Sequence, residues 1–118
     1  MKILLVEDSK TQARFMQAYF ESLKPDWFWA KDAFEAWHLV ASHPDIDIIF
    51  LDAHMPYVSA PLLIRKLKGE DVSKKIPIVV MSGDEHAVEC ISEGAVEFLK
   101  KPFKEHRVLD IIRLYVKS

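Results

Sequence analysis

Several polar side chains in this sequence stand directly after short apolar runs, where carboxylate, hydroxyl and ammonium groups can act together. They are Glu7, Asp8, Asp52, Ser82 and Lys101. Each is ordinary by itself, because acidic pairs occur in solvated turns, serine and aspartate cap helices, and lysine is a common surface residue. As a group they are more informative, because three carboxylates that converge repel one another unless a cation lies among them. Oxygen ligands without histidine or cysteine favour a hard ion, above all Mg²⁺.

The charges of such a cluster balance, because one Mg²⁺ and the Lys101 ammonium together neutralise three carboxylates. A site of this kind can accept a phosphoryl group, since the metal and the lysine offset the charge that develops. Asp52 is the natural nucleophile, because carboxylates form acyl phosphates. Without metal, we expect repulsion to raise the pKa of at least one carboxyl among Glu7, Asp8 and Asp52, so that protons and metal compete.

The elements that must position these residues alternate along the chain. Apolar or β-prone runs predict strands at residues 3–6, 27–30, 46–51, 76–81 and 96–99. Helices are predicted after each strand: from the N-cap Ser9 to Pro25, over residues 34–41, from Pro61 to Gly69, a short one ending at Gly94, and a last one that turns Val108, Ile111, Ile112 and Tyr115 inward. Ser9 and Gln12 have the spacing of a capping box, in which Gln12 reaches back to the start of the helix.

This order predicts an α/β fold of the (βα)5 type, a doubly wound five-stranded parallel sheet with helices on both faces. In such sheets ligands bind beyond the carboxyl ends of the strands, and the polar residues named above follow those ends. The length of 118 residues predicts one domain, residues 1–118.

Composition narrows the function classes. The chain is 50% hydrophobic and 29% charged with a net charge of −2, so we expect neither direct nucleic-acid binding nor attraction to an anionic membrane. We find no apolar run of the ~20 residues needed to span a membrane and no signal peptide, and expect a small cytoplasmic protein. The single cysteine, Cys90, excludes an internal disulfide, and we expect it to be a small packing residue in a helix.

Five ordered motifs run through the chain: ILLVED at residues 3–8, IFLD at 49–52, Met55-Pro56, VVMS at 79–82 and GAVEFLKKPF at 94–103. With these motifs the whole chain resembles the receiver domains of two-component response regulators. The resemblance implies the flavodoxin-like receiver fold with strand order 2-1-3-4-5. It also implies a phosphoacceptor, Asp52, and Mg²⁺ held by Glu7, Asp8, Asp52 and the backbone carbonyl of His54.

The same resemblance implies how the domain would switch. Ser82 and Lys101 would each bond a phosphoryl oxygen, Phe98 would change rotamer on activation, and the Lys101–Pro102 bond would be cis. The phosphoryl group would come from a sensor histidine kinase or a phosphotransfer protein. The chain would catalyse only its own phosphorylation and dephosphorylation, and a downstream protein would bind the face formed by the helix ending at Gly94, the strand 96–99 and the last helix.

Some positions depart from the family's pattern. Ala60 stands where glycine usually closes the loop after the phosphoacceptor, so we expect a different loop path. Gly83 replaces a common alanine, which would loosen the loop after residues 76–81. Phe98 lacks the hydroxyl of a tyrosine switch. His54 and Asp84 occupy variable positions that, in this family, tend to set the lifetime of the phosphoryl group.

Other functions stay open at this point. An aspartyl phosphatase would want a second Asp two residues after the nucleophile, where this chain has His54. A flavodoxin-like electron carrier would need a Ser/Thr/Gly-rich phosphate loop after residues 3–6, which is absent from the sequence. A receiver-like domain that binds partners constitutively would not need all the polar residues that are retained. The chain is expected to be either a stand-alone regulator or the amino-terminal domain of a longer protein.

Overall fold

The computed structural model of the chain describes residues 1–84 and 87–116. Its strands form one parallel sheet in the order β2-β1-β3-β4-β5. They are β1 (Lys2–Val6), β2 (Asp26–Ala30), β3 (Ile48–Asp52), β4 (Ile78–Ser82) and β5 (Glu97–Lys100). The predicted α/β architecture and strand order are confirmed.

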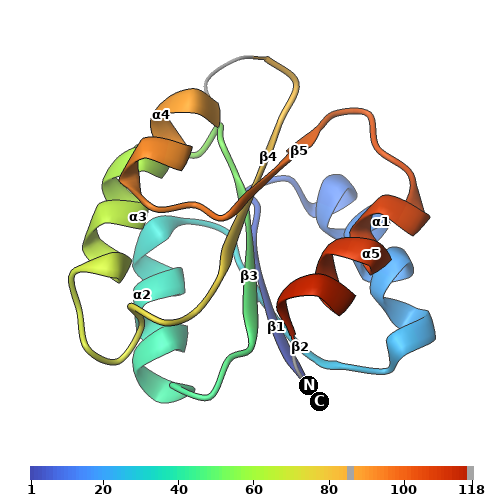
Figure 1. The fold of residues 1–118 in the computed structure, drawn as a ribbon, viewed down its shortest axis with the longest axis horizontal. Coiled ribbons are helices and arrows are strands. Elements are labelled where there is room, and N and C mark those ends of the chain that lie inside the picture. The colour runs from blue at the N-terminus through green and yellow to red at the C-terminus, as the bar shows by residue number, and fades with distance from the viewer. Residues whose placement is uncertain (85–86, 117–118) are drawn as a thin grey trace.

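Helices follow the strands and cover both faces of the sheet (Figure 1). They are α1 (Lys10–Phe20), the short 3₁₀ helix η1 (Glu21–Leu23), α2 (Ala33–Ser42), α3 (Ala60–Lys68), α4 (Ala87–Glu93) and α5 (Glu105–Tyr115). Side-chain oxygens of Ser9, Asp32 and Ser59 accept backbone N–H bonds at the starts of α1, α2 and α3. These caps satisfy donors that a helix leaves unpaired at its N-terminus.

The core consists of two apolar layers, one on each face of the sheet. The layer under α2, α3 and α4 includes Leu4, Leu51 and the buried Cys90. The layer under α1 and α5 includes Leu5, Phe50 and Val108. Because both faces are covered, the central strands β3 and β4 are buried at every position. The carboxyl ends of the strands therefore form one rigid edge.

Three strand predictions placed both boundaries wrongly. Residues 46–51, 76–81 and 96–99 were predicted, whereas β3, β4 and β5 run over Ile48–Asp52, Ile78–Ser82 and Glu97–Lys100. Ile46 and Ile76 are buried, but their N–H groups bond to carbonyls three residues earlier, in turns. Each is therefore apolar because it anchors a turn in the core and not because it belongs to a strand.

The end of the first helix and its predicted cap also differ from the sequence interpretation. α1 ends at Phe20, and the chain continues in the tighter η1 turn to Lys24, whose φ is 48°. The expected return of Gln12 to the backbone of Ser9 is wrong. The Ser9 N–H instead donates to Oε2 of Glu7 at 3.3 Å, because Glu7 lies in the same short turn and offers a carboxylate.

Two of the three tryptophans pack against other rings: Trp27 lies 6.4 Å from Phe20 and Trp37 lies 5.5 Å from Phe34, centroid to centroid, while Trp29 on the edge strand β2 is 37% exposed. The Lys101–Pro102 bond is cis, as the resemblance implied. Within residues 1–84 and 87–116, none of the helices is both long and apolar enough to cross a membrane.

Candidate functional site

A cluster of carboxylates lies at the carboxyl edge of the sheet. Glu7 follows β1 immediately, and its backbone N–H donates to the carbonyl of Ala30 in β2 at 2.9 Å. Asp52 is the last residue of β3, paired with Met81 of β4. One oxygen each from Glu7, Asp8 and Asp52 lies within 4.8 Å of the others. Glu7 and Asp52 are buried, whereas Asp8 is exposed, so the cluster opens to solvent on the Asp8 side.

Burial and crowding change the acidity of this cluster. The pKa of Glu7 is raised to about 8, first because the carboxyl is buried and then because of its hydrogen bond to Asp52 and the negative charge of that residue. The expected rise in a carboxyl pKa is therefore confirmed at Glu7, although burial contributes more than repulsion. The N–H of Ser9 and the charge of Lys101 act in the opposite direction.

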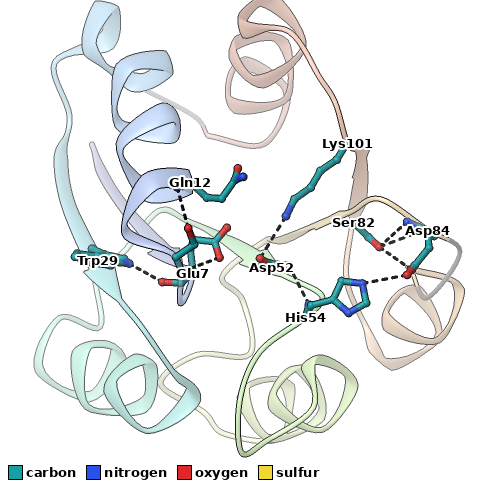
Figure 2. A network of polar contacts seen from close by, with 9 residues as sticks. Glu7, Gln12, Trp29, Asp52, His54, Ser82, Asp84 and Lys101 are labelled. Carbon is teal, nitrogen blue, oxygen red and sulfur yellow. Dashed lines mark hydrogen bonds and ion pairs between the residues drawn. The ribbon is translucent and has the colours of Figure 1, made fainter.

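Asp52 is held by two groups from other parts of the edge (Figure 2). The backbone N–H of His54 donates to its Oδ1 at 2.9 Å, and Nζ of Lys101, in the loop after β5, lies 3.3 Å from its Oδ2. Lys101 is positioned by its own backbone, because its N–H donates to the carbonyl of Ser82 at 2.8 Å. The sheet thus brings together the acidic residues and the lysine that the sequence placed after separate strands.

The donor set fits a hard divalent cation. All of the clustered donors are carboxylate oxygens, which Mg²⁺ prefers, and the exposed side leaves room for the waters that this ion retains. The Lys101 ammonium faces Asp52, and the pKa of Glu7 is raised by burial and by Asp52. A cation among the three carboxylates would favour their charged forms and so compete with protons.

Ser82, the last residue of β4, is buried, and its hydroxyl is turned to Asp84 (Figure 2). Oγ lies 3.0 Å from Oδ1 and 3.2 Å from the carbonyl oxygen of Asp84, and it accepts the Asp84 N–H at 3.2 Å. The other carboxylate oxygen of Asp84 lies 3.0 Å from Nε2 of His54. The sequence predicted Ser82 as a site residue. It did not predict that Asp84 and His54 contact each other.

Phe98 lies in β5, opposite Val80 of β4, and is partly exposed. It lines a surface cavity of about 330 Å³ with Lys104, His106 and Arg107. Of the two family departures in loops, Ala60 is buried as the first residue of α3. A methyl group added at Gly83 would meet no atom within 4 Å.

One contact to the acidic pair has no signal in the sequence. The indole Nε1 of Trp29 donates to the backbone carbonyl of Glu7 at 2.7 Å (Figure 2). The two residues are 22 positions apart, and a tryptophan in a strand reads first as a packing residue. The register of β1 with β2, in which Leu5 pairs with Trp29, is what brings the indole to Glu7.

Known proteins resemble this chain both in sequence and in fold. Residues 3–113 match the family model described as the response regulator receiver domain. A two-component response regulator-like protein of Arabidopsis thaliana, APRR3, is 28% identical over 115 residues, which are 94% of this chain and 23% of that protein. The chain thus spans less than a quarter of this plant relative. A chemotaxis protein CheY homolog of Campylobacter jejuni is 27% identical over 87% of this chain and 82% of its own length.

Solved structures agree. A response regulator receiver domain from Bermanella marisrubri superposes with a TM-score of 0.88 at 28% identity, covering 98% of each chain. The receiver domain of the sensor histidine kinase PA1611 of Pseudomonas aeruginosa, solved with a magnesium ion in its active site cleft, has a TM-score of 0.87 at 24% identity and covers 99% of this chain and 98% of its own. Family match and architecture together show that the chain belongs to the response regulator receiver domain family.

Proposed function

We propose that this chain is a phosphorylation-operated signalling domain in which Asp52 is the phosphoacceptor. The observation that carries the proposal is the meeting of Glu7, Asp8 and Asp52 within 4.8 Å at the sheet edge, with Lys101 3.3 Å from Asp52. Membership of the receiver family supports the same function. The phosphoryl donor would be a sensor histidine kinase or a phosphotransfer protein.

Mg²⁺ would be held by Glu7, Asp8, Asp52 and the backbone carbonyl of His54. When bound, the ion would stabilise the negative charge of the transferring phosphoryl group. The oxygen-only donor set supports this ion. The receiver domain of the Pseudomonas kinase, which shares the fold, carries magnesium in its active site cleft.

The transfer itself needs a positioned carboxylate. An oxygen of Asp52 would form a bond to phosphorus while the bond from phosphorus to the donor's histidine nitrogen breaks, and the electron pair would leave with that nitrogen. The His54 N–H and Lys101 orient the carboxylate before the reaction. To end the signal, water would attack phosphorus while the bond from phosphorus to the Asp52 oxygen breaks, which releases inorganic phosphate and restores the Asp52 carboxylate. The chain would catalyse only these two reactions, its own phosphorylation and its own dephosphorylation.

The signal would leave through Ser82, Lys101 and Phe98. Phosphorylation takes the side chain of Asp52 from −1 to about −2 and adds oxygen acceptors, which Ser82 and Lys101 would bond. Movement of the Ser82 loop would let the partly exposed Phe98 turn inward. Burial of a phenyl ring contributes up to about 1.5–3 kcal/mol, enough to bias a two-state equilibrium by one to two powers of ten.

The face formed by α4, β5 and α5 would bind the downstream protein. It carries exposed apolar side chains: Val88 and Ile91 of α4, Val96 beside β5, and Leu114 of α5. Exposed apolar side chains of this kind are what a protein partner would cover. The cavity lined by Phe98, Lys104 and Arg107 also lies on β5 and the start of α5, which supports a face that changes with the state of the site.

The test is labelling with acetyl phosphate and Mg²⁺, read by intact mass. We expect one phosphoryl group on the wild type and none on Asp52→Asn. Asp71→Asn is the matched control, because Asp71 is highly exposed and lies in the segment after α3, and it should be labelled like the wild type. Undiminished labelling of Asp52→Asn would refute the assignment, and sustained hydrolysis of a generic phosphomonoester would indicate a phosphatase.

A further inference from the structure

The peptide that joins Glu7 to Asp8 is held by the edge strand β2. Its carbonyl oxygen, that of Glu7, accepts the indole N–H of Trp29 at 2.7 Å (Figure 2). The N–H of Glu7 donates to the carbonyl of Ala30 at 2.9 Å. β2 therefore holds the backbone of Glu7 on both sides, once through its main chain and once through a side chain.

The place of this peptide explains why a side-chain bond matters. Glu7 and Asp8 lie between the end of β1 at Val6 and the start of α1 at Lys10, outside the regular ladders of either element. The carbonyl of Glu7 and the N–H of Asp8 belong to one planar unit. A change in ψ of Glu7 would turn that unit and with it swing the Asp8 side chain away from that of Glu7.

Repulsion also favours such a movement. In the absence of a cation, Asp8 is the exposed member of a carboxylate cluster whose other members, Glu7 and Asp52, are buried. The least costly relief is for the exposed residue to turn outward into water. A hydrogen bond to the peptide beside it opposes that movement and keeps the donors arranged before a cation arrives.

We propose that Trp29 is a positioning residue for the metal site: its indole N–H fixes the Glu7–Asp8 peptide and so holds the Glu7 and Asp8 carboxylates in the arrangement that binds Mg²⁺. The inference rests on the metal site of the proposed function. Tryptophan suits the task because its indole N–H is a donor only and because its side chain reaches from the edge strand to the Glu7 carbonyl.

Trp29→Phe tests the role, because it keeps an aromatic ring and removes the donor. A neutral hydrogen bond of ordinary strength corresponds to an increase of about two- to tenfold in the dissociation constant of Mg²⁺, measured by isothermal titration calorimetry. Trp27→Phe is the matched control. Trp27 lies two residues earlier, on the same face of β2, and packs against Phe20, so its loss lowers stability but should leave the Mg²⁺ affinity unchanged.

A second readout follows the peptide itself. In metal-free protein, the ¹⁵N NMR resonance of the Asp8 amide should shift in Trp29→Phe and stay in place in Trp27→Phe. In the wild type, with no substitution, the Trp29 indole and the Asp8 amide should shift with the same midpoint as Mg²⁺ is added. This measurement holds even if Trp29→Phe does not fold.

The outcomes separate the two proposals. If the wild type does not bind Mg²⁺, the metal site of the proposed function is refuted and this role of Trp29 with it. If the wild type binds Mg²⁺ and Trp29→Phe binds it equally well with an unmoved Asp8 amide, only the role of Trp29 is overturned. A wild-type titration in which Asp8 shifts and the indole does not would overturn it too.

Discussion

The Ser82 hydroxyl is hydrogen bonded to the side chain of Asp84, with Oγ 3.0 Å from Oδ1. The same carboxylate reaches His54 through its other oxygen, 3.0 Å from Nε2. In the proposed mechanism Ser82 must donate its single proton to a phosphoryl oxygen on Asp52. To do so, the Ser82 hydroxyl has to give up its hydrogen bond to the Asp84 carboxylate. The strength of that hydrogen bond therefore contributes to the equilibrium between the unphosphorylated and the phosphorylated protein.

Asp84→Ala should make phosphorylation more favourable. The substitution removes the competing acceptor of the Ser82 proton and one negative charge near the site. Since the Asp84 side chain is about half exposed, we expect a moderate effect, about a two- to tenfold rise in the ratio of phosphorylated to unphosphorylated protein at subsaturating acetyl phosphate. Intact mass measures that ratio directly.

A double-mutant cycle with Ser82→Ala separates the two causes. If Asp84 acts by holding the hydroxyl, the gain from Asp84→Ala should shrink when Ser82 is already alanine. An equal gain in both backgrounds would show that Asp84 acts independently of the Ser82 hydroxyl.

Glu7 predicts a pH dependence for the stability of the metal-free protein. Its pKa is raised to about 8 in the folded chain from 4.5, so between these values the folded state keeps a proton that the unfolded state has released. The free energy of unfolding should then fall as pH rises through this window, by at most about 1.4 kcal/mol per pH unit, and the contribution of Glu7 should level off above about pH 8. Denaturant titrations with a chelator present would measure it.

Glu7→Gln isolates this contribution, because it removes the titrating carboxyl and keeps a side chain of nearly the same shape. The difference in the free energy of unfolding between the variant and the wild type should grow as pH rises towards about 8, in favour of the variant. Mg²⁺ affinity of the wild type should increase over the same range, since the metal needs the deprotonated carboxylate. A difference that is independent of pH would contradict the raised pKa.

The fold was largely predictable because its strands are covered on both faces. Runs such as Ile3–Val6 are apolar at every position, and alternation with amphipathic helices leaves few topologies. Hydrophobicity reports burial, however, and burial is not the same as strand pairing. Ile46 and Ile76 are buried in turns, and the polar residues Asp52 and Ser82 complete strands that appeared to stop before them.

That the candidate residues lie together was predictable from the sequence, but the contacts between them were not. Topology alone brings Glu7, Asp52 and Lys101 to one edge, so their meeting followed from their places after strands. Which group satisfies which depends on register and rotamers. The hydrogen bond from Trp29 to Glu7 depends on the register of β1 with β2. The Ser82 hydroxyl bonds to Asp84 because of the rotamers of both side chains, which the sequence does not reveal.

The ion pair between Asp52 and Lys101 gives opposite predictions for its two members. Asp52 is buried and shares its site with two other carboxylates, so Asp52→Asn should stabilise the metal-free protein, by about 1–2 kcal/mol. Lys101→Met leaves Asp52 without the ammonium 3.3 Å away and should destabilise it by about 1–3 kcal/mol.

The double variant tests whether these effects share a cause. With Asp52 already neutral, Lys101→Met should cost much less than it does in the wild type. Chemical denaturation of the four proteins gives the coupling. Additive effects would mean that Lys101 stabilises the fold through its packing and not through Asp52.

Tyr57, in the loop between Asp52 and α3, gives a prediction that does not depend on function. Its φ is 70°, and the N–H of Val58 donates to the carbonyl of Pro56 at 2.8 Å, which makes Tyr57 the centre of a γ-turn with positive φ. This turn is rare and strained for a residue with a Cβ. Because the ring is 84% exposed, its packing contributes little to the free energy of unfolding. Glycine adopts positive φ without that cost.

Comparison of Tyr57→Gly with Tyr57→Ala isolates the backbone, because both remove the ring and only alanine keeps the Cβ. In most positions alanine is the more stable of the two, since glycine loses more conformational freedom on folding. At Tyr57 the order should reverse, with Tyr57→Gly more stable by about 1 kcal/mol, measured by denaturant titration in the presence of a chelator. If Tyr57→Ala is the more stable variant, the loop after Asp52 does not hold a strained residue in solution, and its path there differs from the one described.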